Sequence, residues 1–116
     1  MTKLEIKKLD KLWSEKVKEN ANYKCEKCGK RSYLNSHHFY SRSNHSIRYN
    51  LSNGFCLCSG CHCLSSAFSA HKTPADFVDW AVQQRGEAWL ERLRKMRNII
   101  ARKQDYEQIE RELNGN

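Results

Sequence analysis

Two pairs of cysteines constrain the fold of this chain more than any other feature of its sequence. Cys25 and Cys28 form one Cys-x-x-Cys unit, and Cys58 and Cys61 form a second one beyond residues 29–57. A spacing of two residues lets a tight turn direct both sulfur atoms at one ion, and two such turns supply the four thiolates of a structural zinc site. The sequence therefore predicts one structural Zn²⁺ with no open coordination position for chemistry.

Composition favours metal binding over disulfide formation. The chain has 116 residues, six of them cysteine, and residues 1–20 are charged rather than apolar, so nothing indicates export to an oxidising compartment. No segment approaches the roughly 20 apolar residues that span a bilayer. We therefore expect a soluble cytoplasmic protein that does not interact with membranes. Cys56 and Cys63 are expected to be small, partly buried apolar side chains.

One α+β domain covering residues 1–116 is expected, because a chain of this length normally forms a single domain and no linker divides it. Residues 1–22 are predicted to form an N-terminal helix, residues 23–72 a zinc-bound core, and residues 73–116 C-terminal helices. In segment 34–57, apolar residues lie among Ser, Asn and Gly. This pattern is typical of two short strands joined by a polar loop.

Apolar residues at helical spacing predict an N-terminal helix from Lys3 to about Glu19 and two C-terminal helices. The first C-terminal helix begins with Thr73 as N-cap and Pro74 at the first helical position, and Gly86 ends it. The next begins near residue 87. The expected buried faces comprise Leu9, Leu12, Trp13 and Val17 in the first helix, Phe77, Trp80, Ala81 and Gln84 in the second, and Trp89, Leu90, Leu93, Met96 and Ile100 in the third.

Two further segments carry weaker helical signals. Residues 62–70 follow the second cysteine pair and are predicted to be helical despite their serine residues. Beyond Arg102 the apolar residues thin out to Tyr106, Ile109 and Leu113. We expect this end to be a protruding helix, a helix that binds a protein partner, or a frayed tail.

Histidine and asparagine residues between and just after the cysteine pairs carry the functional signal. The segment from Ser36 to His62 resembles the HNH endonuclease motif, whose three signature residues correspond here to His38, Asn53 and His62. Residues 36–42 and 48–54 further resemble phage NinG-like recombination nucleases, and the double histidine is similar to that of colicin-type nucleases. The resemblance covers roughly residues 23–75 and implies a small zinc-stapled ββα-metal (HNH) core with flanking helices.

The resemblance implies a metal-dependent endonuclease that hydrolyses DNA phosphodiester bonds and leaves 5′-phosphate and 3′-hydroxyl ends. His38 takes the place of the general base, because an imidazole has an ordinary pKa suited to deprotonating water near neutral pH. Asn53 is expected to hold the His38 loop by hydrogen bonds across the hairpin. His37, which alternates with His38 on a strand, and His62 are expected to hold one catalytic divalent metal.

The sequence departs from this family at two positions. Many members carry Asp where His37 stands, and an imidazole shifts metal preference from Mg²⁺ toward Mn²⁺, Ni²⁺ or Zn²⁺, so all four ions remain candidates. Colicin-type members also place another histidine one helical turn after the last signature histidine. Position 66 is Ser here, and His71 is the nearby candidate for a third ligand; the alternative is that His71 lies at the surface or at a helix entry.

A net charge of +8 favours a polyanionic partner, and DNA is the expected one. Arg42 and Arg48 flank the polar loop and are candidate phosphate clamps, because a guanidinium can grip two phosphate oxygens. Lys30 and Arg31 are candidates for a basic rim, although charged surface residues often serve only solubility. The NinG-like resemblance suggests branched or flapped DNA as the substrate, and a bacterial or phage-infected cell as the setting.

Two other functions fit the same sequence. The main alternative is a non-catalytic zinc-knuckle module that binds nucleic acid as an accessory factor. It predicts zinc and a basic surface but has no need of a base at His38. The second is a toxin or anti-defence protein whose helices, the C-terminal one included, bind another protein.

Overall fold

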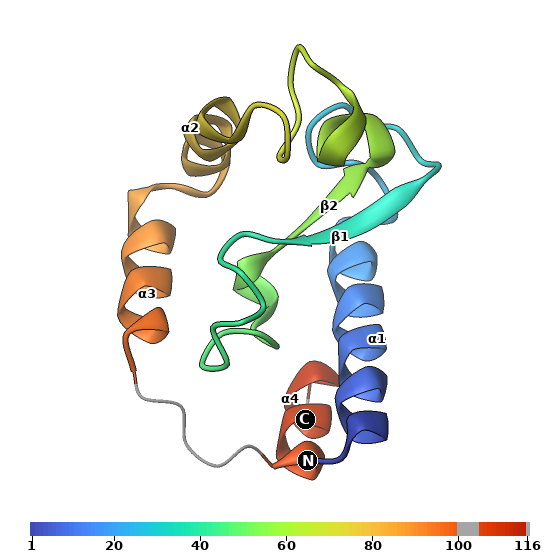
Figure 1. Ribbon diagram of the computed structural model, residues 1–116, viewed down its shortest axis with the longest axis vertical. Coiled ribbons are helices and arrows are strands. Elements are labelled where there is room, and N and C mark those ends of the chain that lie inside the picture. The colour runs from blue at the N-terminus through green and yellow to red at the C-terminus, as the bar shows by residue number, and fades with distance from the viewer. Residues whose placement is uncertain (100–104, 116) are drawn as a thin grey trace.

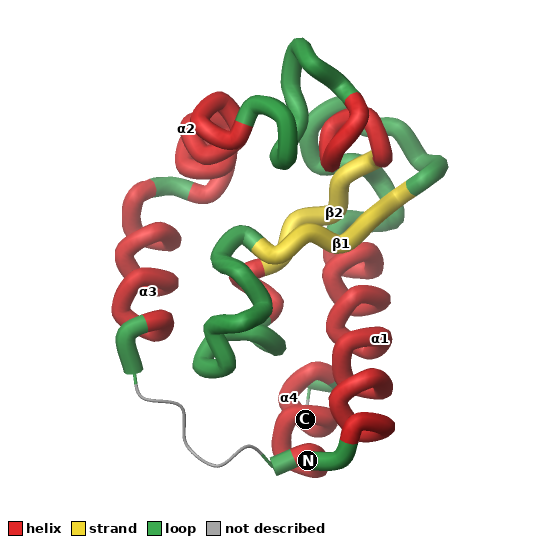
Figure 2. The backbone as a smooth tube through the Cα atoms, viewed as in Figure 1, coloured by secondary structure: helices red, strands yellow, loops and turns green. Residues whose placement is uncertain are grey.

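A two-stranded antiparallel hairpin lies between an N-terminal helix and a pair of C-terminal helices (Figure 1). The computed structural model describes residues 1–99 and 105–115. The elements are α1 (Lys3–Asn20), β1 (Leu34–His38), the short 3₁₀ helix η1 (Leu51–Asn53), β2 (Gly54–Cys58), the π-helical turn η2 (Gly60–Leu64), α2 (Pro74–Arg85), α3 (Glu87–Arg97) and α4 (Tyr106–Leu113). Figure 2 shows that long loops connect the hairpin to the helices around it. None of the described helices is long and apolar enough to cross a membrane.

The hairpin register decides which side chains share a face. His37 pairs with Phe55 and His38 pairs with Gly54. Because side chains alternate across a strand and directly opposed residues share a face, His37 and His38 point to opposite sides of the sheet. His37 faces the core that includes Phe77 of α2, whereas His38 faces α1.

Two hydrophobic clusters cover the two faces. The larger one joins the Phe55 and Leu57 side of β2 to the buried residues of α2 and α3, namely Phe77, Ala81, Trp89, Leu90 and Leu93. The second joins Cys56, on the opposite face of β2, to Leu9, Trp13 and Val17 of α1 and to Leu113 of α4. The hairpin is thus a central layer between two thin cores.

The prediction for α1 is confirmed in extent and in orientation. Thr2 caps the helix: its hydroxyl accepts a hydrogen bond from the Glu5 amide, while the Glu5 carboxylate accepts one from the Thr2 amide. Such a reciprocal pair satisfies two amides that a helix start leaves without partners. Leu9, Trp13 and Val17 recur every four residues and are buried, so α1 presents one apolar stripe to the hairpin.

The start and end of α2 are also confirmed, with two corrections to the side-chain roles. Pro74 opens the helix, and Gly86, with φ of +90°, ends it in a conformation that favours glycine. The Thr73 side chain does not cap α2, because its hydroxyl hydrogen-bonds to the backbone of Ser69 instead. Gln84, predicted to lie on the buried face, is exposed.

For α3 the predicted face is confirmed over most of its length. Trp89, Leu90 and Leu93 are buried, and Met96 is partly buried. Ile100, the last residue of the predicted stripe, lies outside the described residues.

The predicted helix over residues 62–70 is wrong beyond its first turn. Helical structure ends with η2 at Leu64, and bends and turns follow. The hydroxyl of Ser65 accepts hydrogen bonds from the amides of Ala67 and Phe68, and that of Ser69 accepts one from Lys72. Serine side chains that bond nearby amides in this way offer the backbone an alternative to the helix.

Within the described residues 105–115, the C-terminal segment neither protrudes nor frays. Helix α4 lies against α1 (Figure 1), with Leu113 buried and Tyr106 and Ile109 packed against the second cluster. Asp105 caps this helix through its carboxylate, which accepts a hydrogen bond from the Glu107 amide. The apolar side of α4 is therefore used within the chain.

Candidate metal centres

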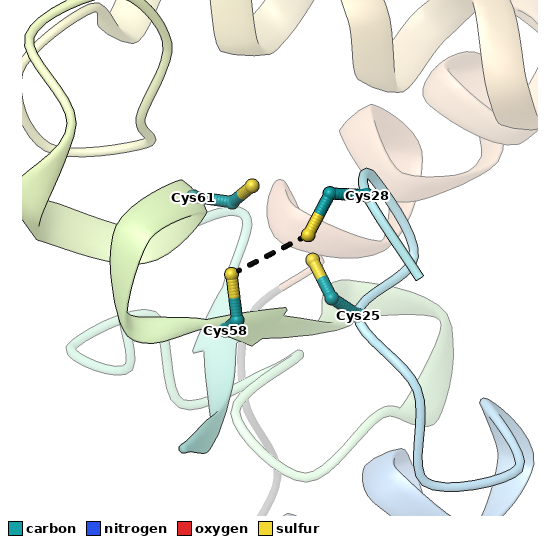
Figure 3. A group of neighbouring side chains, drawn as sticks. All are labelled: Cys25, Cys28, Cys58 and Cys61. Atoms are coloured by element: carbon teal, nitrogen blue, oxygen red, sulfur yellow. Dashed lines mark hydrogen bonds between the residues drawn. The ribbon is translucent and has the colours of Figure 1, made fainter. Parts of the chain in front are cut away.

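The four cysteines of the two Cys-x-x-Cys units converge on one point (Figure 3). Their sulfur atoms all lie within 4.8 Å of one another, and Cys28 Sγ and Cys58 Sγ are 3.6 Å apart. Sulfur atoms on one tetrahedral zinc lie about 3.8 Å apart, since each Zn–S bond is about 2.3 Å long. This group, which we call the four-cysteine cluster, can therefore hold a structural metal such as zinc.

Backbone geometry builds the first half of the four-cysteine cluster. The Cys25 amide donates to the Lys30 carbonyl, and the Gly29 amide donates to the Cys25 carbonyl, which closes a tight turn. Gly29 has a φ of +81°, a conformation that residues with a Cβ rarely adopt. The second half consists of the end of β2, which carries Cys58, and of η2, which carries Cys61.

The cluster already favours negative charge on one sulfur. Burial of Cys25 opposes ionisation, but N–H groups of Cys28, Cys58 and Lys27 outweigh it and lower the pKa of the Cys25 thiol to about 7. The pKa of Cys61 is raised, by burial first and then by the neighbouring Cys25 thiolate. Without a cation the four thiols cannot all ionise near neutral pH, so metal binding would release protons.

Cys56 and Cys63 lie outside this cluster. Cys56 is fully buried against α1, and burial followed by the nearby Glu26 carboxylate raises the pKa of its thiol to about 11. Cys63 is partly exposed. The expectation of partly buried side chains therefore holds for Cys63, while Cys56 is more deeply buried than expected.

A second cluster consists of three imidazoles from three different segments. His37 comes from β1, His62 from η2 and His71 from the turn before α2, and one ring nitrogen of each lies within 4.8 Å of the others. His62 Nε2 and His71 Nε2 are 3.1 Å apart. Nitrogens bound to one ion at about 2.1 Å lie roughly 3.0–3.4 Å apart, so this pair has the spacing of shared ligands. We call these residues the three-histidine cluster.

The electrostatics favour neutral imidazoles at two positions of the three-histidine cluster, His37 and His62. Burial, followed by the proximity of His62 and His71, lowers the pKa of His37 to about 4. Burial and the neighbouring His71 also lower the pKa of His62. A neutral imidazole has a free lone pair, which is the form that binds metals. The donor set therefore fits a borderline divalent ion such as Zn²⁺ or Ni²⁺ better than Mg²⁺, which prefers oxygen ligands.

His38 lies on the other face of the hairpin, against α1. Its ring stacks on Trp13, with centroids 3.8 Å apart and an angle of 7° between the planes. His38 Nε2 lies 3.0 Å from the Arg48 carbonyl oxygen. Burial lowers the pKa of His38, and the contact with the Arg48 carbonyl opposes this. Because a carbonyl only accepts, Nε2 carries the proton in this contact and Nδ1 is left as the acceptor of a neutral ring.

Asn53 holds the chain just after His38. It is fully buried, its Oδ1 accepts a hydrogen bond from the Tyr40 amide at 2.8 Å, and its Nδ2 donates to the Tyr40 carbonyl at 2.9 Å. The Asn53 carbonyl in turn accepts a hydrogen bond from the Phe39 amide. These three bonds fix the path of the chain where β1 ends.

The four predicted phosphate-binding residues have different surroundings. Arg48 forms a bidentate ion pair with Asp10, with distances of 3.0 and 2.7 Å, so its guanidinium already has a carboxylate partner. Arg42, Lys30 and Arg31 are exposed. The Lys30 ammonium lies 5.4 Å from the centre of the Tyr33 ring, which is 75% exposed.

Sequence reasoning did not single out the residues of α1 that surround His38. Trp13 was predicted only as a buried residue of an amphipathic helix, and Asp10 was not singled out. Neither carries a local signal for contact with residues 38 and 48, because that contact depends on how α1 packs on the hairpin.

Comparison of the chain with protein-family models, curated proteins and solved structures finds no match. The structure itself defines a chain of helices around a small antiparallel sheet, with a four-cysteine cluster suited to a structural metal. It is compatible with an α+β, zinc-containing fold.

Proposed function

We propose that this protein is a metal-dependent endonuclease of the HNH type that hydrolyses phosphodiester bonds in DNA. One observation carries the proposal: His37, His62 and His71 converge in a second cluster that could hold a metal ion, separate from the four-cysteine cluster. A structural metal in the four-cysteine cluster does not require these three histidines. The resemblance of segment 36–62 to the HNH motif supplies the reaction class.

Each side chain has a defined task in this proposal. His37, His62 and His71 hold a divalent metal, which when bound stabilises the charge that develops on the phosphate and on the leaving 3′ oxygen. His38 accepts the proton of the attacking water at Nδ1, because the Arg48 carbonyl keeps the other ring proton on Nε2. Asn53 fixes the backbone just beyond His38. The exposed Arg42, together with the basic surface, binds DNA phosphates.

Plasmid cleavage tests the proposal. Zinc-loaded protein is expected to nick DNA when Mn²⁺, Ni²⁺, Zn²⁺ or Mg²⁺ is added, with Mg²⁺ the weakest because the three-histidine cluster offers nitrogen ligands. His38→Ala is expected to lower the rate about 100-fold or more, the usual contribution of a general base. His45→Ala serves as the matched control, since His45 is an exposed histidine of the neighbouring loop, and is expected to cleave normally.

Equal cleavage by His38→Ala and the wild-type protein would overturn the assigned mechanism. Absence of cleavage with every metal, on linear, flapped and four-way DNA alike, would favour the non-catalytic zinc-knuckle module. In that case, DNA binding that survives His38→Ala is expected.

A further inference from the structure

Two contacts fix the ring of His38. Trp13 covers one side of its ring at 3.8 Å, and the carbonyl of Arg48 fixes one ring nitrogen. The stacking requires that Trp13 come close to the hairpin. Gly54, which pairs with His38, permits this because a Cβ at position 54 would lie 2.8 Å from the Trp13 ring.

The segment that carries the Arg48 carbonyl is itself tied to α1 at two points. Asp10 binds the Arg48 guanidinium through both carboxylate oxygens. The Trp13 indole N–H donates to the Asn50 carbonyl at 3.1 Å. Asp10 and Trp13 are three residues apart and lie on neighbouring positions of the helix surface. One face of α1 therefore holds both the ring of His38 and the loop that fixes its tautomer.

We infer that Asp10 is a positioning residue for His38 and acts through Arg48, so that α1 forms part of the catalytic apparatus. This inference rests on the proposed role of His38 as the base. The Asp10 carboxylate fixes the Arg48 side chain, the Arg48 carbonyl holds the His38 Nε2 proton, and Nδ1 is thereby presented to the water. Arg48 then positions His38 and does not bind phosphate. This role differs from the one that the sequence suggested for it.

Kinetics of DNA cleavage provide the first test. Asp10→Asn keeps the size of the side chain and removes the charge, and is expected to lower kcat on the order of tenfold with KM unchanged, because a small misplacement of a base slows the chemical step. Arg48→Lys keeps the positive charge but cannot form the bidentate pair, and is expected to match it. The double variant is expected to lose no more than either single one. Glu15→Gln, on an exposed part of α1, is the control and is expected to retain full kcat.

The tautomer of His38 provides a test that does not need activity. Long-range ¹⁵N–¹H spectra of the zinc-loaded full chain are expected to show that His38 is protonated at Nε2 and unprotonated at Nδ1. Asp10→Asn is expected to give a mixture of both tautomers, whereas Glu15→Gln is expected to leave the wild-type spectrum unchanged.

The two measurements separate this inference from the proposed function. If the wild-type protein cleaves no DNA but Asp10→Asn mixes the tautomers, the positioning role stands and the nuclease assignment fails. If Asp10→Asn leaves the His38 spectrum unchanged, the inference is overturned whatever the activity. A raised KM with unchanged kcat would also overturn it, because Asp10 and Arg48 would then affect DNA binding instead.

Discussion

At the scale of single residues, the amide of Asn53 shows how one buried polar group can organise a loop. Both of its polar atoms bond to the backbone of Tyr40, and no described buried side-chain nitrogen or oxygen lacks a hydrogen-bond partner. Buried polar groups are costly when unpaired, so such a fully satisfied pair favours one loop conformation over others. The end of β1 thus has a single defined path.

Replacing Asn53 with Asp is expected to destabilise the protein with almost no change in shape. A carboxylate can accept from the Tyr40 amide but cannot donate to the Tyr40 carbonyl, which leaves two acceptors facing each other in a buried site. The free energy of unfolding should fall by about 1–3 kcal/mol, measured by urea denaturation of the zinc-loaded protein.

Asn44→Asp is the matched control for this change. Asn44 donates to the Ser41 carbonyl in an exposed turn, and the expected change there is within about 0.5 kcal/mol. Equal effects of the two substitutions would show that the buried position of Asn53 does not matter.

At the scale of elements, the fit of α1 on the hairpin depends on a close approach at one glycine. An added Cβ at Gly54 would lie 2.5 Å from Val17 Cγ2 and 2.8 Å from Trp13 Cζ2. Real Cβ atoms do not approach other atoms so closely, so the helix and the strand can pack this tightly only because position 54 has no side chain. The same contact sets the position of Trp13 against His38.

Gly54→Ala is therefore expected to push α1 away from β2. The expected loss is about 1–3 kcal/mol of unfolding free energy, the usual cost of adding volume to a packed core, together with a weaker Trp13 contribution to the near-ultraviolet circular dichroism. Gly60→Ala, where the nearest atom would be Cys58 Sγ at 3.8 Å, is expected to be tolerated. Similar thermal stability of Gly54→Ala and Gly60→Ala would contradict the proposed overpacking.

At the scale of the whole molecule, the four-cysteine cluster and a set of hydrogen bonds join segments that are far apart in sequence. Glu26, inside the first Cys-x-x-Cys unit, bonds to the Cys56 amide of β2 and pairs with Arg85 of α2 at 3.0 Å. Arg85 also donates to the carbonyls of Ser52 and Gly54 and lies 3.6 Å from the centre of the Phe55 ring. The first cysteine turn is thereby tied to the hairpin and to α2.

Removal of the structural metal is expected to unfold the core. Binding of a structural zinc contributes about 10–16 kcal/mol in small domains, which is comparable to or larger than the total stability of a typical domain at about 5–15 kcal/mol. A strong chelator should therefore abolish the near-ultraviolet circular dichroism signal of the tryptophans, and Cys28→Ser should have the same effect without chelator.

Two variants distinguish the metal centres in this experiment. His71→Ala is expected to keep one tightly bound zinc per chain and the native spectrum, because the four-cysteine cluster is intact. Cys63→Ser is expected to behave as the wild-type protein. A native spectrum after complete removal of zinc would refute the structural role of the four-cysteine cluster.

Local features allowed much of the fold to be predicted from sequence. The two Cys-x-x-Cys spacings indicated the four-cysteine cluster, the stripe of Leu9, Trp13 and Val17 indicated the buried face of α1, and Pro74 and Gly86 marked the limits of α2. These signals act over a few residues, through turn geometry, helical periodicity and backbone conformation. The serines after η2 carried a similar local signal, but their competing hydrogen bonds with the backbone prevailed over the predicted helix.

Only the tertiary structure decided which distant residues meet. The sequence left two alternatives for His71, a third metal ligand or a residue at the surface or at a helix entry. The turns after η2 bring it beside His37 and His62. The packing of α1 on the hairpin directs Asp10 to Arg48 and Trp13 to His38. Strand register and helix packing arise from many weak contacts over the whole chain, so no short motif encodes them. The sequence thus determined the candidate metal ligands, while the packing of α1 determined the surroundings of His38.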